Sequence, residues 1–112
     1  MLRIILFIRP HRLEQVKSAI AAIGVSGMTV SDVRGTGNSP ESGQWLPGEG
    51  HVIPLPIQSR IEIVIPDDMK DRTIEAILAS AQTGEPSDGK IFIQKVEDAV
   101  RIRTGERGET GL

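Results

Sequence analysis

The stretch IQSRIEIVI, residues 57–65, carries the periodicity from which the fold follows. Its isoleucines share one face of an extended chain with Ser59, because successive side chains of a strand point to opposite sides. The polar residues of the other face are Gln58, Arg60 and Glu62. The stretch therefore predicts a strand with one buried face and one polar face, and Pro66 ends it.

Upstream, the apolar and β-branched run Leu2–Arg9 predicts a first, buried strand. Pro10 suits the first turn of a helix, and Gly24 suits the position that closes it. Four apolar residues follow between them at helical spacing: Leu13, Val16, Ile20 and Ile23. Met28–Arg34 is then expected as the second strand.

Downstream of residues 57–65, a second helix is expected. Asp67 or Asp68 would cap its N-terminus, and Gly84 would end it. Its buried stripe would consist of Met69, Thr73, Ile74, Ile77 and Ala81. Ile91–Ile93 begins a fourth strand, and Val100–Ile102 is expected as a short edge segment.

This order, strand–helix–strand twice over, predicts one domain over residues 1–112 with a ferredoxin-like βαββαβ fold of the α+β class. Both helices would cover one face of the sheet. The other face would meet a partner or stay in contact with water. Its polar residues indicate an oligomer interface or a cavity.

The composition limits the classes of function. The chain of 112 residues has 38% hydrophobic residues, no cysteine and a formal net charge of −2. The charge argues against non-specific binding to nucleic acid, and the lack of cysteine excludes disulfides and thiolate metal sites. The longest apolar run, Ile4–Ile8, is too short for insertion into a membrane or for a signal peptide. A cytoplasmic protein is expected.

Residues 37–56 show neither helical nor strand periodicity, and a loop of this length is more than a compact domain needs. Glycine, proline and serine indicate a flexible loop. Trp45, in its middle, would either anchor a partner or fold back onto the protein itself. The sequence leaves both interpretations open.

The last third of the chain holds the main candidate site. A turn over Thr83–Lys90, rich in small residues, can point several backbone N–H groups into one concavity, which suits an anion. Lys90, Arg101 and Arg103 add positive charge and donors for a phosphate chain. The two arginines lie two residues apart, so they would project from one face of an extended segment. Solvated charge at a strand edge is the alternative.

Several stretches, taken in order and at their spacing, resemble the PII signal-transduction proteins over essentially the whole chain. They are Gly24–Val30, Ile61–Asp68, Ala81–Gly84, Asp88–Phe92 and Arg101–Glu106. The resemblance implies a ferredoxin-like protomer in a compact homotrimer, with adenine nucleotides bound in three clefts between subunits. It also implies a regulatory T-loop, which corresponds to residues 37–56.

Position by position, the resemblance implies two groups of ligands for ATP or ADP, with AMP as a further candidate. The phosphate group comprises Ser87, Asp88, Gly89, Lys90, Arg101 and Arg103. The adenine and ribose group comprises Thr29, Glu62 and Val64, together with the backbone of Gly35, Thr36 and Gly37.

The chain departs from that family at positions that serve nitrogen sensing. Ser39 stands where the proteins that sense 2-oxoglutarate complete the Mg-ATP site with a glutamine. Gln58 stands where a lysine pairs with the 2-oxoglutarate carboxylate, and His51 stands where some members carry a uridylylated tyrosine. Asn38 replaces an arginine of the family, and Ser87 replaces a glycine. Pro47 stands where other members carry the loop arginine that plugs ammonium channels. The response to Mg-2-oxoglutarate and uridylylation are therefore expected to be lost.

Two classes of function follow. The first is a nucleotide-responsive regulator whose loop, with Trp45 and His51, contacts a partner protein. That partner would be a membrane transporter or an enzyme of nitrogen or inorganic-carbon metabolism, with bicarbonate as a candidate second ligand, or a metal-efflux system. The second is a slow ATPase or phosphatase in the same pocket.

No base or amide that would position a water remains near the γ-phosphate, so no catalytic residues are expected. A structural trimer with a decayed site is a third possibility. His51, although close to Glu49, is interpreted as an ordinary loop histidine, because two distant histidines and no cysteine make a poor metal set.

Overall fold

The computed structural model describes residues 1–36 and 55–112. Its helices and strands are β1 (Leu2–Ile8), α1 (Leu13–Ala22), β2 (Thr29–Arg34), β3 (Ile57–Ile65), α2 (Lys70–Ala81) and β4 (Gly89–Lys95). Three short 3₁₀ helices accompany them: η1 (Pro10–Arg12), η2 (Asp67–Met69) and η3 (Gly108–Gly111). The βαββαβ order confirms the ferredoxin-like α+β fold. The expected T-loop, apart from Leu55 and Pro56, lies outside the described residues.

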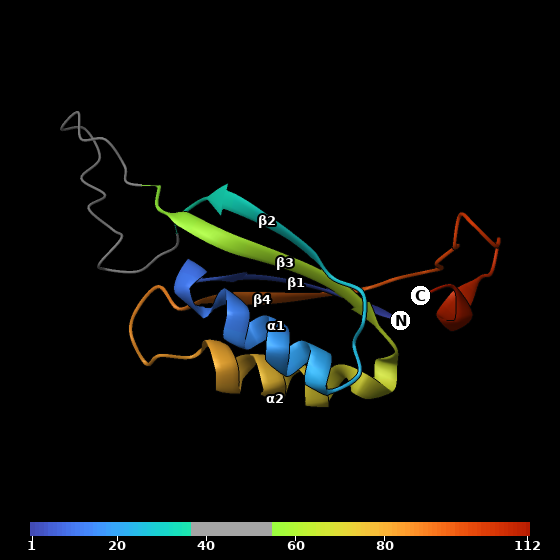
Figure 1. The fold of residues 1–112 in the computed structure, drawn as a ribbon, viewed down its shortest axis with the longest axis horizontal. Helices are drawn as coiled ribbons and strands as arrows, with labels where there is room; N and C mark the ends of the chain where they lie inside the picture. The colour runs from blue at the N-terminus through green and yellow to red at the C-terminus, as the bar shows by residue number, and fades with distance from the viewer. Residues whose placement is uncertain (37–54) are drawn as a thin grey trace.

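The four strands form one antiparallel sheet in the order β2-β3-β1-β4 (Figure 1). β1 lies in the interior of the sheet, between β3 and β4. β2 pairs with β3 from Arg34↔Ile57 to Thr29↔Glu62. Over residues 63–65, β3 therefore extends past the end of β2. Among the described residues, its strand neighbour there is β1, and β2 leaves its outer edge unpaired.

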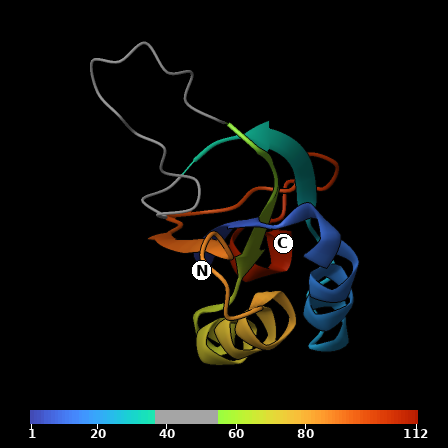
Figure 2. The same cartoon turned by 90° about the vertical axis from the view of Figure 1, so that its left-hand side faces the viewer.

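Both helices cover one face of the sheet, as expected, and Figure 2 shows the helical layer beneath the strands. Alternate residues of β1 and β3 point into this layer, which explains why the core is aliphatic. The buried apolar residues are Leu2, Ile4, Leu6, Ile8, Val16, Ile20, Val25, Ile61, Ile63, Ile65, Ile77 and Ala81. Ile57, at the start of β3, is 48% exposed.

The opposite face of the sheet, called the open face below, carries both apolar and charged side chains. The rings of Phe7 and Phe92 meet edge to face, with 6.1 Å between their centroids. Phe92 remains 49% exposed. The polar residues of β3 lie on this face, as the alternation of residues 57–65 predicts.

The helix ends differ from the sequence expectation in two places. Within residues 1–36 and 55–112, no side chain caps η2 or α2. Asp67 instead pairs with the α-amino group of Met1 at 2.8 Å, and the hydrogen bond from that group lowers the pKa of Asp67. α2 ends at Ala81, where Gln82 turns extended, and Gly84 lies in the following turn with a φ of 84°.

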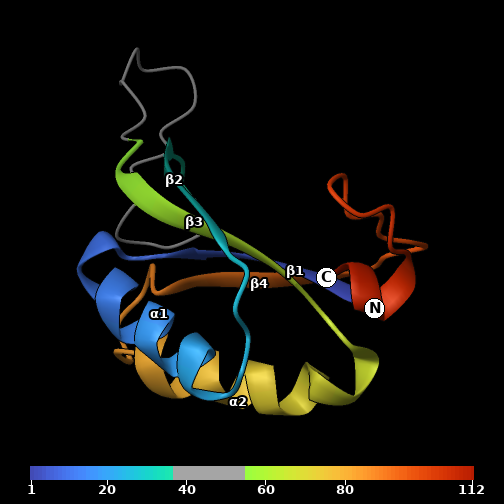
Figure 3. The same cartoon turned by 45° about the vertical axis from the view of Figure 1, so that its right-hand side comes forward.

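The segment after β4 projects beyond the end of the sheet, and both chain termini lie at this end of the molecule (Figure 3). The N–H of Val96 donates to the carbonyl of Met1 at 3.1 Å and joins the segment to β1. No helix in the described part of the chain has the length and apolar character that a membrane span requires.

Candidate functional site

The turn over residues 83–90, which joins α2 to β4, is organised by one carboxylate. Asp88 accepts hydrogen bonds from the N–H groups of Thr83 (2.8 Å) and Gly84 (3.0 Å) and from the Thr83 hydroxyl. Nε of Arg9 donates to the same carboxylate at 3.1 Å. The Thr83 hydroxyl first, then the backbone donors and Arg9, lower the pKa of Asp88 to about 2. The carboxylate is therefore ionised, and its contacts lie within the protein.

Three residues of this turn have backbone conformations that favour glycine. The φ angle is 84° at Gly84, 71° at Ser87 and 121° at Gly89. A β-carbon on Gly89 would lie 1.8 Å from the carbonyl oxygen of Phe7, so only glycine fits there. Consecutive N–H groups around a left-handed residue form the kind of concave arrangement that binds anions.

Lys90 follows the turn and carries an exposed side chain. It pairs with Phe7 in the register of β1 and β4, which places it on the open face. Within residues 1–36 and 55–112 its ammonium group has no hydrogen-bond or ion-pair partner. The turn thus has a cation beside it that the described residues leave uncompensated.

A pocket of about 600 Å³ lies at the start of β2. It brings together Thr29, Glu62 and Val64, the three residues expected to contact adenine. The other lining residues are Gly24, Val25, Ser26, Gly27, Met28, Ile63, Ile65, Pro66, Met69, Glu109 and Leu112. Because β3 extends past the end of β2 here, the pocket adjoins a strand edge whose backbone groups β2 does not pair.

Glu62 is held between two arginines of the open face. Nε of Arg3 lies 2.5 Å from one carboxylate oxygen, and Nη2 of Arg60 lies 3.1 Å from the other. The bond from Arg3 is the main cause that lowers the pKa of Glu62, and the same bond raises the pKa of Arg3. The pocket is therefore lined in part by an ionised, oriented carboxylate.

Arg101 and Arg103 lie on a turn, whereas the sequence predicts an extended edge segment. Val100 makes only an isolated bridge, with Arg107, and residues 102–104 form the turn. Gly105, with a φ of 73°, allows this reversal, and its N–H donates to the carbonyl of Arg101 at 2.7 Å. The two arginines therefore do not alternate along a strand.

The partners of the two arginines differ. Arg101 donates to the carboxylate of Glu106 at 3.4 Å and to the carbonyl of Leu112 at 2.5 Å. Arg103 is exposed, and its guanidinium has no partner in the part of the chain that the structure describes. The intervening Ile102 is fully exposed, at 101%.

Gly35 and Thr36 follow β2 at the base of the expected T-loop. The N–H of Gly35 donates to the carbonyl of Pro56 at 3.1 Å, which joins the two ends of the loop. A β-carbon on Gly35 would lie 3.3 Å from Oε1 of Gln58, so this neutral amide stands at the loop base. Seven residues discussed above lie outside the described residues: Gly37, Asn38, Ser39, Trp45, Pro47, Glu49 and His51.

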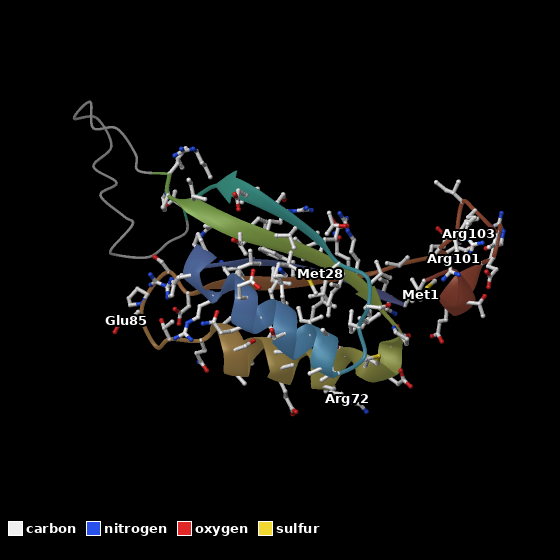
Figure 4. The ribbon with its side chains drawn as sticks, in the orientation of Figure 1. Met1, Met28, Arg72, Glu85, Arg101 and Arg103 are labelled. Carbon is white, nitrogen blue, oxygen red and sulfur yellow. The ribbon has the colours of Figure 1, made fainter. Side chains whose placement is uncertain are left out.

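The residues expected at one site fall into separate places in the single chain. The pocket and the segment with the two arginines lie at one end of the molecule, because Glu109 and Leu112 of that segment line the pocket. The turn that contains Glu85 lies at the other end (Figure 4). β4, which links the two ends, has seven residues and spans about 20 Å. One chain alone therefore does not bring Lys90 to Arg101 and Arg103.

Sequence reasoning missed several residues of these places, among them Arg9 and Glu109. Arg9 ends an apolar run, and nothing in the local pattern indicates its contact with Asp88. Glu109 lies in η3, which is too short to show periodicity. In the described residues, no three histidine, aspartate or glutamate side chains gather as a metal site would require.

Comparison with known proteins identifies the family of the chain. The family model described as nitrogen regulatory protein P-II matches residues 1–106. The chain is 41% identical over 105 residues to nitrogen regulatory protein P-II of Haemophilus influenzae, covering 94% of each. It is 47% identical over 112 residues to nitrogen regulatory protein P-II 2 of Methanothermobacter thermautotrophicus, covering 100% of this chain and 97% of that protein.

A solved structure shows the same fold. The crystal structure of Arabidopsis thaliana PII bound to citrate superposes with a TM-score of 0.81 at 39% identity, covering 99% of this chain and 91% of that one. Sequence, order of elements and fold therefore lead to one conclusion: the chain belongs to the P-II family of nitrogen regulatory signalling proteins.

Proposed function

We propose that this PII-family protein binds an adenine nucleotide between the subunits of a homotrimer and controls a partner protein through residues 37–56. The observation that supports this proposal is that the expected site residues lie at two separate ends of one chain. The pocket and two arginines lie at one end of the chain, and the 83–90 turn with Lys90 lies at the other. A second copy that presents one end to the other would complete a site for base and phosphates.

The pocket supports the assignment of the base. Its walls are largely apolar, as in most small-molecule sites, with a few polar groups to fix orientation. The unpaired edge over residues 63–65 offers backbone donors and acceptors to the edge of a purine, and Thr29 and Glu62 stand beside it. Adenine is the base that the family resemblance implies.

The charges support the assignment of the phosphates. Lys90 and Arg103 have no anionic partner among the described residues, and bringing them together between two copies would be unfavourable without an anion. The Arabidopsis relative is bound to citrate, a polyanion. ATP and ADP, with AMP as a further candidate, are the ligands that we propose.

The signals to which we propose that the protein responds differ from those of a 2-oxoglutarate sensor. Gln58, half-buried at the loop base, carries no charge with which to pair a carboxylate. The chain has no tyrosine to be uridylylated. The partner that we propose is a membrane transporter or an enzyme of nitrogen or inorganic-carbon metabolism, with bicarbonate as a candidate second ligand.

Calorimetric titration of the protein with ATP, ADP and AMP, each with and without 2-oxoglutarate or bicarbonate, tests the proposal. We expect saturable binding of an adenine nucleotide at one site per chain and no effect of 2-oxoglutarate. Sedimentation should give three times the chain mass of 12.1 kDa. A monomer, or a trimer that binds no nucleotide, would overturn the proposal.

A gain-of-function variant tests the lost input separately. Gln58→Lys combined with Ser39→Gln restores the two family side chains, and we expect it to begin to bind 2-oxoglutarate in the presence of Mg-ATP. Gln58→Arg alone adds the charge without the second group and serves as the matched control. If the double variant shows no response, the loss extends beyond these two positions.

A further inference from the structure

Arg9 directly follows β1 and reaches across to the turn that leads into β4. Its Nε atom donates to Oδ1 of Asp88 at 3.1 Å, and its Nη2 atom donates to the carbonyl of Pro86. These two partners flank Ser87, whose φ of 71° lies in the left-handed region. One guanidinium therefore holds both neighbours of the residue with the least favourable backbone conformation in the turn.

The contact with Pro86 sets the direction of a backbone donor. The peptide bond between Pro86 and Ser87 is trans, and in a planar trans peptide the C=O and the following N–H point in opposite directions. Because the carbonyl of Pro86 points at Arg9, the N–H of Ser87 points away from it. The guanidinium thus leaves this donor available to a ligand on the far side of the turn.

The contact with Asp88 keeps a negative charge away from that ligand. The carboxylate also accepts bonds from Thr83 and Gly84, so its oxygens are turned into the protein. The side chains of Arg9 and Asp88 are only 30% and 22% exposed, which makes the pair stronger than one at the open surface. Without Arg9, the carboxylate would repel a polyanion at the neighbouring N–H groups.

We propose that Arg9 is a positioning residue for the phosphate site: it holds residues 86–88 in the conformation that presents the backbone N–H groups of Ser87 and Asp88 to the phosphate chain, without touching the nucleotide. This role rests on the proposed function and adds a residue that neither the sequence pattern nor the family resemblance assigns to the site.

Calorimetric titration of Arg9→Met with ATP and with AMP tests the role. Arg72→Met is the matched control, because Arg72 is an exposed arginine of α2 with no ion pair in the described part of the chain. We expect Arg9→Met to weaken ATP binding about tenfold. AMP binding should change much less, because AMP brings one phosphate to the site and ATP brings three. Arg72→Met should leave both affinities unchanged.

A double variant separates positioning from direct contact. In Asp88→Asn the ion pair is already lost, so the further change Arg9→Met should weaken ATP binding much less than it does in the wild-type background. Equal losses in the two backgrounds would show that Arg9 does not act through its pair with Asp88, and they would overturn the role proposed here for that pair. Arg9→Lys should recover part of the affinity, because lysine can pair with Asp88 but lacks the planar fork that also reaches Pro86.

Thermal unfolding of each variant accompanies the titrations. If Arg9→Met is unfolded at the titration temperature, Arg9→Lys takes its place in the same comparison. A folded variant that binds ATP as tightly as the wild type overturns the role of Arg9 and leaves the proposed function standing. A wild-type protein that binds no ATP overturns the proposed function, and the role of Arg9 with it.

Discussion

A β-carbon on Gly89 would lie 1.8 Å from the carbonyl oxygen of Phe7 and 2.9 Å from its carbonyl carbon. Gly89 pairs with Ile8 at the point where β4 begins to run along β1. The obstacle is backbone of the interior strand, so it cannot move aside as the end of a flexible side chain would. The absence of a side chain at residue 89 therefore allows the 83–90 turn to lie directly against the end of β1.

Gly89→Ala should lower the free energy of unfolding by more than Gly84→Ala does. Both glycines have positive φ angles, 121° and 84°, and a left-handed conformation alone costs an alanine about 1–2 kcal/mol. Only Gly89 adds a clash, because nothing lies within 4 Å of a β-carbon at Gly84. We expect a loss of about 1–2 kcal/mol for Gly84→Ala and about 3 kcal/mol or more for Gly89→Ala.

Urea unfolding of both glycine variants, at one fixed protein concentration, measures these losses. Equal losses would show that the backbone conformation alone, and not the contact with Phe7, determines the need for glycine.

The pairing of Asp88 predicts a stability that depends on pH. The pKa of Asp88 falls from an ordinary 3.8 to about 2 in the folded protein, so its contribution is complete above the unfolded value and is lost as the pH falls through the folded one. The shift corresponds to roughly 2 kcal/mol. Asp88→Asn should therefore be less stable than the wild type at pH 7, and the difference should narrow between about pH 4 and pH 2.

Urea unfolding of the wild type and Asp88→Asn across this pH range measures the difference. It isolates Asp88 because Glu62, Asp67 and Asp98, whose pKa values are also lowered, titrate in both proteins. A difference that stays constant down to pH 2 would show that the charge of Asp88 is not what stabilises the turn.

Thr73 buries its hydroxyl group in α2. The residue is fully buried, and among the described residues its Oγ1 accepts and donates no hydrogen bond. Thr73→Val keeps the shape and removes the unsatisfied group, so it should raise the free energy of unfolding by about 1 kcal/mol. Thr73→Ser keeps the hydroxyl, removes a methyl group and should lower stability by about 1 kcal/mol. A loss of stability in Thr73→Val would reveal a partner for the hydroxyl.

The strands and the faces of the sheet could be predicted together, because the alternation of apolar and polar residues indicates both a strand and the side of it that is buried. In residues 57–65 the buried isoleucines and the polar residues opposite them define the strand and its orientation together. Helix ends carry weaker signals. Asp67 satisfies every local rule for a helix cap, but its carboxylate forms an ion pair with the α-amino group of Met1 instead. The antiparallel pairing of β1 and β3 brings these two groups close together.

The residue types of the candidate site could be predicted, but their placement could not. Charged and apolar residues alternate over residues 101–103, but three residues are too few to distinguish a strand from a turn. Gly105, with its positive φ, allows the chain to form the turn. The contact between Arg9 and Asp88 joins residues 79 positions apart. Only the register of β1 and β4 brings them together, and no local pattern reports that register.

Lys90→Ala and Arg103→Ala should each weaken ATP binding by about 1.5–3 kcal/mol, the range for hydrogen bonds that involve a charged group. Lys95→Ala is the matched control, because Lys95 is an exposed lysine at the last position of β4, the strand in which Lys90 is the second residue. It removes the same charge but should leave the affinity unchanged.

Because Lys90 and Arg103 lie at opposite ends of one chain, a loss of ATP affinity in both variants would require a site that two copies share. Calorimetric titration of the three variants measures the affinities, and unchanged binding in both Lys90→Ala and Arg103→Ala would remove these residues from the phosphate site.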